Sequence, residues 1–192
     1  MNHFFAYMSR LKLINRWGLM RNTRQENDAE HSFQAAVIAH GIALIGKERF
    51  GREIDPEHVL ALAVYHDAHE VITGDMPTPI KYHNPRIKQD FQNLEEVASD
   101  MLLNMLPENM QAAYQPYLKP DEEALEWRIV KAADRLCAYI KCLEEQKAGN
   151  QEFEQAKKAI AKSIETIDLP EVQAFFEEFV GSFGLTLDEL NR

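Results

Sequence analysis

Apolar side chains recur at steps of three and four residues along nearly the whole chain, which is the spacing that an amphipathic helix produces. In residues 2–16 the apolar stripe consists of Phe4, Phe5, Met8, Leu11 and Ile14. In residues 29–47 it consists of Phe33, Val37, Ile38, Ile42 and Ile45. Both stretches therefore predict helices that turn one face toward a core.

Turn and capping residues divide the rest of the pattern into further helices. Asp55 followed by Pro56 is typical of a helix start, because Asp caps the first turn and Pro fits its first position. Pro77 and Pro79 end that helix, whereas Asp121 is expected to begin a long one. We expect helices over about residues 2–16, 29–47, 55–72, 86–105, 121–147, 151–167 and 170–181, with a short proline-rich connection between residues 106 and 120.

No segment shows the alternation of a β-strand, and no internal repeat or low-complexity tract is visible. With 192 residues, of which 45% are hydrophobic, the chain is long enough to bury one full core. We therefore expect an all-α fold and a single domain over residues 1–192.

The charge balance and the N-terminus restrict the kind of partner. The chain has 31 acidic and 21 basic residues, a formal net charge of -10, so no overall positive field attracts a nucleic-acid polymer. The N-terminus lacks the apolar run of a signal peptide or a membrane span, which favours a cytoplasmic protein that binds no membrane. Cys137 and Cys142 lie in a helical stretch and are expected to be buried thiols.

A cluster of chemically active residues lies near the end of the 55–72 helix. His66 and Glu70 differ by about 40° around a helix, so the imidazole and the carboxylate share a face, with Asp67 beside them. Imidazole and carboxylate groups are ligands of borderline divalent metals, and a neighbouring carboxylate that binds no metal can move a proton. The cluster indicates a metal-dependent hydrolase, although a His-Asp pair is also common at surfaces and helix caps.

Two residues of other predicted helices have the same character. His31 lies near the start of the second helix, and Asp134 lies in the long helix among small and apolar neighbours. Asp134 is expected to face inward, where a carboxylate is costly unless it is paired or binds a metal. The alternative for Asp134 is a salt bridge to Arg135 or Arg128.

The order of these residues on separate helices resembles the HD-domain superfamily of metal-dependent phosphohydrolases. The resemblance implies an HD-domain helical bundle in which four residues bind one divalent metal, namely His31, His66, Asp67 and Asp134. Two imidazoles and two carboxylates leave coordination positions for water and substrate, as a catalytic site requires.

Further segments resemble the bacterial HD-domain 5′-deoxynucleotidases over nearly the whole chain. These segments are His3–Ala6, Ser9–Trp17, Glu30–Ser32, Tyr65–Ala68, Thr73–Asp75, Pro77–Pro79, Cys137–Tyr139 and Lys141–Glu145. The resemblance implies hydrolysis of deoxyribonucleoside 5′-monophosphates to a deoxynucleoside and phosphate by a cytoplasmic homodimer. It also implies one divalent transition metal as cofactor, with Co, Mn, Cu, Zn and Fe as the open choices.

Two adjacent residues have the chemistry to hold such a substrate. Arg16 offers a planar fork of donors that suits phosphate oxygens, and we expect it to bind substrate and to assist catalysis. In the resembling family the tryptophan at the position of Trp17 packs where a 2′-hydroxyl would lie, which implies a preference for deoxyribose. Without that resemblance, Arg16 is a solvated residue at a helix end and Trp17 a core aromatic.

The loop after the His-Asp segment is expected to contact the sugar. Its proposed substrate-binding residues are Asp75, Met76, Pro77 and Thr78. A carboxylate in this turn can accept a hydrogen bond from a 3′-hydroxyl, and the prolines reduce the entropy that is lost on binding. Capping of the turn is the alternative role for Asp75 and Thr78.

Asp67 and Glu70, the two carboxylates near His66, are expected to have different roles in the reaction. Asp67 is expected to orient the attacking water as well as to bind the metal, and Glu70 is expected to transfer a proton. The sequence leaves open whether Glu70 acts as a base toward the water or as an acid toward the leaving 5′-oxygen. A salt bridge to Lys81 is the alternative for Glu70.

Two other functions are open. An HD phosphohydrolase can act on a ribonucleotide, a triphosphate or a cyclic nucleotide, but Arg16, Trp17 and the short loop favour a small monophosphate, since no further basic cluster is visible. A catalytically silent HD regulatory module is the other alternative. An intact set of predicted metal ligands together with Glu70 argues against it.

Overall fold

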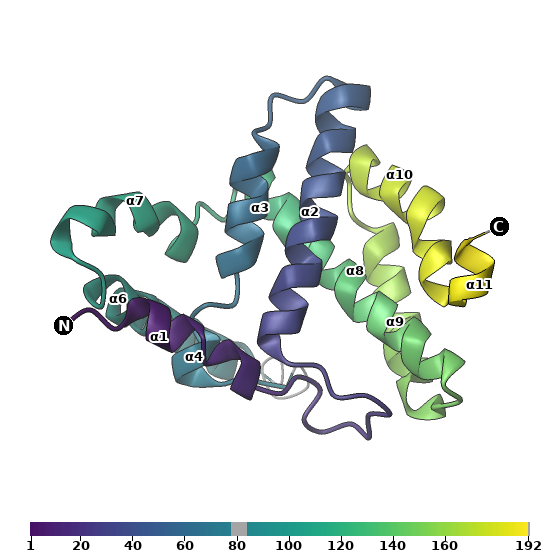
Figure 1. Ribbon diagram of the computed structural model, residues 1–192, viewed down its shortest axis with the longest axis horizontal. Coiled ribbons are helices and arrows are strands. Elements are labelled where there is room, and N and C mark those ends of the chain that lie inside the picture. The colour runs from purple at the N-terminus through teal and green to yellow at the C-terminus, as the bar shows by residue number, and fades with distance from the viewer. Residues whose placement is uncertain (78–83, 192) are drawn as a thin grey trace.

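The computed structural model describes residues 1–77 and 84–191, and helices are the regular elements of this part of the chain (Figure 1). Two long helices, α2 (Asp28–Phe50) and α8 (Leu125–Lys147), cross near the centre. Helices α3 (Pro56–Tyr65) and α10 (Pro170–Phe179) pack against α2. The arrangement confirms the predicted all-α fold.

The other helical elements are shorter or lie around this centre. They are α1 (Phe4–Met8), η1 (Leu11–Leu13), α4 (Glu70–Thr73), α6 (Pro85–Asn104), α7 (Glu108–Leu118), η2 (Gln151–Phe153), α9 (Glu154–Glu165), η3 (Val180–Gly184) and α11 (Leu187–Leu190). In Figure 1, α1, α4, α6 and α7 lie to the left of α2, on the side of the chain's N-terminus. Helices α9, α10 and α11 lie to the right of α2, on the side of the C-terminus. Among the described helices, none is at once long and apolar enough to cross a membrane.

Short polar side chains cap the N-termini of the helices that carry the predicted site. The Asn27 side chain accepts the backbone N–H of Glu30 at 3.0 Å, which satisfies one free donor in the first turn of α2. The Asp55 carboxylate accepts two backbone N–H groups at the start of α3, and Pro56 occupies the first position, as predicted. These caps fix where α2 and α3 begin.

The main core lies where α2, α3, α8 and α10 meet. Its fully buried members include Ala39, Ile42, Val59, Ala63, Ile129, Leu136, Ile140 and Val172. A smaller cluster joins α1, α6 and α7 through Phe4, Ala68, Leu102, Leu106 and Leu118. Burial of the Val, Leu and Ile side chains among them stabilises the fold by about 1.5–3 kcal/mol each, so the helices of the site pack on a stable core. Cys137 and Cys142 are free, buried thiols, as predicted.

The predicted helix over residues 2–16 is wrong in its second half. The chain forms only α1 and η1 there, and Ile14 is extended, with φ -98° and ψ 117°. Asn15 then pairs with Asn27 in an antiparallel bridge, where Asp28 N–H donates to the Ile14 carbonyl at 3.1 Å. This long-range pairing outweighs the local helical spacing.

The predicted continuous helix over residues 55–72 is also wrong, because α3 ends at Tyr65 and a four-residue turn precedes α4. In that turn Ala68 N–H donates to Tyr65 O at 2.9 Å, and Glu70 N–H donates to Asp67 O at 3.0 Å. These bonds span three residues instead of four, so the turn is wound more tightly than an α-helix. The 40° relation between His66 and Glu70 therefore does not apply.

Two predictions between residues 105 and 125 are wrong as well. The expected connection contains α7, which continues through Pro116 because Tyr114 packs against Phe4 and Tyr65, with ring centroids 5.1 and 5.8 Å apart. The long helix begins at Leu125, because the Asp121 carboxylate accepts Glu123 N–H in a local turn. The C-terminal region also contains α11, which the sequence pattern did not predict.

Candidate metal and phosphate site

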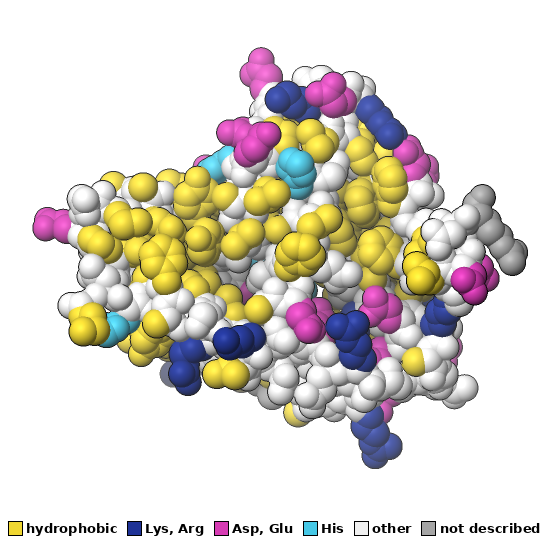
Figure 2. Space-filling view, in the orientation of Figure 1, with side chains coloured by type: hydrophobic (Ala, Val, Ile, Leu, Met, Phe, Trp, Pro, Cys, Tyr) yellow, Lys and Arg dark blue, Asp and Glu magenta, His cyan; other side chains and the backbone are white. Residues whose placement is uncertain are grey.

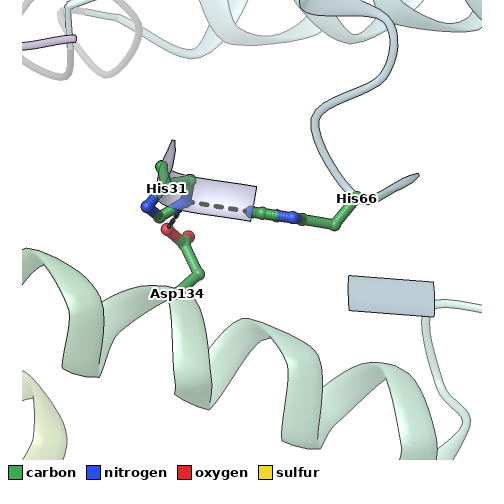
Figure 3. Close-up of side chains that lie close together, drawn as sticks. All are labelled: His31, His66 and Asp134. Atoms are coloured by element: carbon green, nitrogen blue, oxygen red, sulfur yellow. Dashed lines mark hydrogen bonds and ion pairs between the residues drawn. The ribbon is translucent and has the colours of Figure 1, made fainter. Parts of the chain in front are cut away.

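Three predicted metal ligands, His31, His66 and Asp134, meet where α2, α8 and the turn after α3 approach one another (Figure 3), and Asp67 lies beside them. His31 Nε2 lies 3.2 Å from His66 Nε2 and 3.3 Å from Asp134 Oδ1. Asp67 Oδ2 lies 3.0 Å from His66 Nε2 and 3.5 Å from His31 Nε2. The two imidazoles are almost completely buried, whereas the Asp134 side chain is 26% exposed, so the cluster opens toward solvent on the α8 side.

The hydrogen bonds around the imidazoles fit a metal site. His66 Nδ1 lies 2.7 Å from the Ala63 carbonyl, an acceptor, so Nδ1 carries the proton and the lone pair of Nε2 faces the cluster. His31 has the corresponding arrangement, because its Nδ1 lies 3.6 Å from Glu26 Oε1 and its Nε2 faces Asp134. Two nitrogen and two carboxylate donors suit a borderline divalent cation.

The charge states of the carboxylates agree with that use. Burial opposes ionisation of Asp67, but His66, His31 and Arg16 hold the pKa of this carboxyl well below its usual range. Burial likewise opposes ionisation of Asp134, and its pKa is nevertheless lowered, chiefly by the hydrogen bond from His31 and by the charge of Lys131. Both groups are therefore anions at neutral pH, as metal ligands must be.

Arg16 reaches the same cluster from the N-terminal segment. Its Nη1 donates to Asp67 Oδ2 at 3.2 Å. The other carboxylates around its guanidinium are those of Asp134 at 3.8 Å, Asp28 at 3.9 Å and Glu26 at 4.0 Å. The bridge between Asn15 and Asn27 places Arg16 here. It is thus a buried cation beside the predicted metal ligands and not the solvated residue of the alternative interpretation.

Glu70 lies beside this cluster at the start of α4, and only 9% of its surface is exposed. Burial and the charges of Asp67, Asp28 and Asp75 raise the pKa of Glu70 to about 11. Its Oε2 has no hydrogen-bond partner among the described residues. Glu70 therefore lies beside the cluster with a raised pKa, which suits a carboxyl group that exchanges a proton. Lys81, the alternative partner of Glu70, lies outside the described residues.

Trp17 follows Arg16 with a backbone φ of +60°, which is uncommon for a residue with a large side chain. Its indole Nε1–H donates to Glu26 Oε2 at 3.0 Å, and its ring packs on Phe153 with centroids 5.3 Å apart. The indole is half-buried. It is therefore held between the polar site and η2 and does not belong to the main core.

The predicted sugar-binding loop is described in part. Asp75, Met76 and Pro77 are half-buried and lie outside regular helix, whereas Thr78 lies outside the described residues. Asp75 is close enough to Glu70 and Asp28 for its charge to raise the pKa of both carboxyls. The start of this loop therefore borders the site.

A cavity of about 970 Å³ opens beside His66 and Asp67, between α6 and α8. Its lining includes five basic residues, Lys88, Lys119, Arg128, Lys131 and Arg135, and six acidic residues, Asp67, Glu95, Glu96, Glu122, Glu123 and Asp168. The sequence pattern did not indicate a basic cluster here, because the basic residues come from α6, α8 and the end of α7. Lys131 Nζ also lies 3.8 Å from Asp134 Oδ2, so Lys131 and Arg16 are basic partners of Asp134, whereas the alternative interpretation named Arg135 or Arg128.

Sequence reasoning missed the acidic residues at the start of α2. Asp28 is fully buried between Arg16 and Glu70, and burial raises its pKa to about 6. Glu26 contacts Trp17, His31 and Arg16. Both residues belong to a polar stretch that resembles a simple helix break. The available signal was the number of carboxylates directly before His31.

A second missed group fixes the segment that carries Arg16 and Trp17. Glu145 of α8 is 1% exposed, and its carboxylate accepts the backbone N–H of Thr23 at 2.9 Å and the Thr23 hydroxyl at 2.8 Å. Lys141 Nζ donates to Glu145 at 2.5 Å and to the Arg24 carbonyl at 2.6 Å. The Asn150 side chain also donates to Glu145, at 2.8 Å. We call Lys141, Glu145 and Asn150 the α8 anchor.

Comparisons with known proteins match nearly the whole chain. A family model described as 5′-deoxynucleotidase YfbR-like matches residues 3–183. A 5′-deoxynucleotidase of Erwinia tasmaniensis is 50% identical over 192 residues, which cover 100% of this chain and 97% of the relative. A 5′-deoxynucleotidase of Yersinia pestis is 50% identical over 196 residues, with 100% of this chain and 98% of the relative covered.

Solved structures have the same fold. An HD-domain phosphohydrolase from Listeria innocua aligns with a TM-score of 0.78 and 25% identity, over 98% of this chain and 92% of that one. A cyanophage S-2L HD phosphohydrolase, solved with dA and one catalytic Zn²⁺ ion, aligns with a TM-score of 0.59 and 18% identity, over 92% of this chain and 96% of that one. The second likeness shows the fold alone.

Proposed function

Because the chain belongs to the YfbR-like 5′-deoxynucleotidase family, as its resemblance predicted, we propose that it hydrolyses deoxyribonucleoside 5′-monophosphates to a deoxynucleoside and phosphate. The observation that carries the proposal is the meeting of His31, His66, Asp67 and Asp134 beside Arg16. This arrangement provides metal donors and a phosphate-binding cation in one buried place.

The proposed ligands of the cation are the two imidazole Nε2 atoms and the carboxylates of Asp67 and Asp134. Their donor types fit Zn, Co, Mn, Fe or Cu, and the choice among these depends on availability as well as affinity. When bound, such a cation polarises water and shields the charge of a phosphate group. The cyanophage enzyme, whose likeness shows the fold alone, binds dA and one Zn²⁺, and we propose a nucleotide-related substrate and a metal of this class for the present chain as well.

The other residues act on the substrate and on protons. The guanidinium of Arg16, which lies 3.2 Å from Asp67 Oδ2, binds phosphate oxygens next to the metal ligands. Asp67 orients the attacking water. Glu70 moves a proton, either from that water or to the leaving 5′-oxygen, and it sits one turn from Asp67 in a buried environment.

The deoxyribose is held by the two segments that border the site. Trp17 forms the wall against the 2′-position of the sugar. Two observations support this role: its ring is half-buried, and its indole N–H is held by a hydrogen bond to Glu26. Asp75, Met76, Pro77 and Thr78 bind the sugar from the loop after α4. The position of Asp75 near Glu70 supports this placement for the start of the loop.

Phosphate release from a panel of nucleotides tests the proposal. The protein is stripped with a chelator, reloaded with one divalent metal at a time, and supplied with deoxy- and ribonucleoside mono-, di- and triphosphates. Rapid hydrolysis of deoxyribonucleoside 5′-monophosphates after reloading, with slower hydrolysis of the ribonucleotides, is expected. Hydrolysis that survives complete metal removal would contradict the metal-dependent assignment, and activity confined to ribonucleotides would contradict the substrate.

A second candidate function is hydrolysis of nucleotides with longer phosphate chains. The observation behind it is that five basic residues, Lys88, Lys119, Arg128, Lys131 and Arg135, line the cavity that opens beside His66 and Asp67, although six acidic residues line it too. Additional phosphates carry additional negative charge, which basic side chains in this cavity would attract. The same panel separates the two functions, because the second predicts that di- or triphosphates are hydrolysed faster than monophosphates.

The protein acts as a cytoplasmic homodimer. The two cysteines are buried and unpaired, as proteins of a reducing compartment keep them. The proposed dimer surface is an apolar face of α2 and α3, over which hydrophobic side chains gather in Figure 2. Its exposed members are Phe33, Val37, Leu44, Leu60 and Val64. An exposed apolar face of this extent is typical of a surface that a second protein covers.

A further inference from the structure

Glu26 lies between His31, a proposed metal ligand, and Trp17, the proposed wall of the sugar site. It precedes α2 and leaves only 14% of its side chain exposed. Its position is fixed by the backbone, because the Arg16 N–H donates to the Glu26 carbonyl at 3.0 Å and the neighbouring Asn27 pairs with Asn15. The carboxylate therefore has a defined direction, and its two oxygens face different partners.

One oxygen of Glu26 fixes Trp17. Oε2 accepts the indole Nε1–H at 3.0 Å, which is the one side-chain hydrogen bond of this indole among the described residues. Trp17 adopts a left-handed backbone conformation, which costs about 1–2 kcal/mol in a residue with a Cβ atom. The bond to Glu26 and the packing on Phe153 offset this cost and hold the indole in one orientation.

The other oxygen of Glu26 faces the metal side of the site. Oε1 lies 3.6 Å from His31 Nδ1 and 4.0 Å from Arg16 Nε. His31 Nδ1 has no hydrogen-bond partner within normal distance among the described residues, so the Glu26 carboxylate is the acceptor placed to receive its proton. A carboxylate on Nδ1 keeps the lone pair of Nε2 directed at the metal, which is the usual role of a carboxylate behind a metal-binding histidine.

We propose that Glu26 is a positioning residue that serves metal binding and sugar selection together: its Oε1 orients His31 toward the metal, and its Oε2 holds Trp17 against the 2′-position of the sugar. The second part rests on the proposed function, because it needs a deoxynucleotide in the site. The first part needs only the cation.

Three variants separate the two contacts. Glu26→Gln keeps the shape of the side chain, but its single acceptor oxygen follows the formed bond to the Trp17 indole and turns an NH₂ group toward His31. His31 then accepts at Nδ1 and carries its proton on Nε2, the wrong tautomer for the metal. Affinity for Zn²⁺ or Co²⁺ is expected to fall about 10- to 100-fold, while the ratio of dAMP to AMP hydrolysis is retained.

Glu26→Ala removes both contacts, so both the metal affinity and the dAMP-to-AMP ratio are expected to fall. Trp17→Phe removes the indole N–H together with the five-membered ring, leaves the contact between Glu26 and His31 in place, and is expected to keep the metal affinity. Metal affinity is measured by titration of the stripped protein with Zn²⁺ or Co²⁺ alone. The orientation of Trp17 is measured by its fluorescence in a Trp127→Phe background, in which Glu26→Ala is expected to change the emission and Glu26→Gln to leave it near that of the parent.

Glu30→Gln is the matched control, because it removes one negative charge from an exposed position on the next turn. It is expected to change metal affinity by less than about twofold, as for an exposed charge. Wild-type metal affinity in Glu26→Gln overturns the contact to His31, and wild-type sugar selectivity in Glu26→Ala overturns the contact to Trp17. If Glu26→Ala does not fold, the fluorescence and selectivity of a Glu26→Leu variant decide the second contact in its place. Metal titration and fluorescence need no substrate. They therefore test the two contacts of Glu26 even if the protein proves not to be a nucleotidase, so failure of this inference can be told apart from failure of the proposed function.

Discussion

The carboxyl groups of the site divide into two kinds at the scale of single residues. Asp67 and Asp134 face imidazoles and cations, which hold their pKa below its usual range. Glu70 and Asp28 are buried among other carboxylates, and their pKa is raised to about 11 and about 6. Neighbouring carboxyls with opposite shifts commonly divide the work of catalysis, with the ionised pair binding a cation and a protonated one transferring a proton.

Replacement of Glu70 tests this division. Glu70→Gln keeps the size of the side chain but cannot exchange a proton, so the turnover number is expected to fall at least about 100-fold. Metal affinity and KM are expected to stay near those of the wild type, because Glu70 is neither one of the four proposed metal donors nor a proposed phosphate ligand. Steady-state kinetics and metal titration measure the three quantities. A turnover number near that of the wild type would remove Glu70 from the reaction.

Replacement of Asp134 tests the metal site itself. Asp134→Ala removes one donor and leaves His31 without its 3.3 Å partner, so the purified protein is expected to contain little metal and to lose activity. Metal content after dialysis is measured by elemental analysis. Asp100→Asn, an exposed carboxylate paired with Lys119, is the control and should bind metal normally. Full metal content in Asp134→Ala would contradict the ligand assignment.

At the scale of elements, the segment between η1 and α2 depends on the α8 anchor. The main chain of Thr23 and Arg24 is bound to Glu145 and Lys141, more than a hundred residues away in sequence. Trp17 and Glu26 lie in this same segment. The geometry at the site is therefore set partly by a buried ion pair on the distant end of α8.

The anchor gives the protein a specific sensitivity to acid. Hydrogen bonds from Lys141, Asn150 and Thr23 outweigh the effect of burial and lower the pKa of Glu145 to about 2. A lowered pKa in the folded state contributes stability above the ordinary glutamate pKa of about 4.3, and this contribution is lost as the pH falls toward 2. The loss is on the order of 3 kcal/mol.

Denaturant unfolding between pH 7 and pH 3 measures this effect. The free energy of unfolding of the wild type is expected to fall more steeply below about pH 4.3 than that of Glu145→Gln, which lacks the titrating group. Glu154→Gln, an exposed glutamate paired with Lys158, is the control and should follow the wild type. Identical pH dependence in the wild type and Glu145→Gln would show that the anchor has no such role.

The sequence pattern predicted some elements of the fold and not others. The apolar spacing predicted that α2, α6 and α8 exist, because they are long, and residue chemistry selected the side chains that meet in Figure 3. The predicted core stripe of α2 was wrong for Phe33 and Val37, which are 73% and 55% exposed, whereas Ile38, Ile42 and Ile45 are buried, because α2 carries apolar side chains on its outer face as well. It did not predict the bridge between Asn15 and Asn27, which pairs segments that carry no period of their own. The position of Glu26 depends on that bridge, and the α8 anchor depends on contacts between residues more than a hundred positions apart in the chain. Their importance is a property of tertiary contacts and is not encoded in local spacing.

At the scale of the whole molecule, the apolar face of α2 and α3 predicts self-association. Phe33, at 73% exposure, is the most exposed of the five side chains on this face. Phe33→Glu places a charge at the proposed interface and is expected to convert a dimer to a monomer in sedimentation velocity experiments. Leu187→Glu, an equally exposed residue on α11, is the control. A wild-type monomer, or a dimer unaffected by Phe33→Glu, would contradict this surface.

The proposed metal donors come from α2, α8 and the turn after α3, which are separated by up to a hundred residues of chain. The unfolded chain has no preformed site, so a cation bound by these donors favours the folded state by RT ln(1 + [M]/Kd), about 2.7 kcal/mol at a hundredfold excess over Kd. The melting temperature should therefore rise with the logarithm of the free metal concentration. The cation would act as a removable cross-link between helices, and chelation would lower the temperature at which the whole protein unfolds.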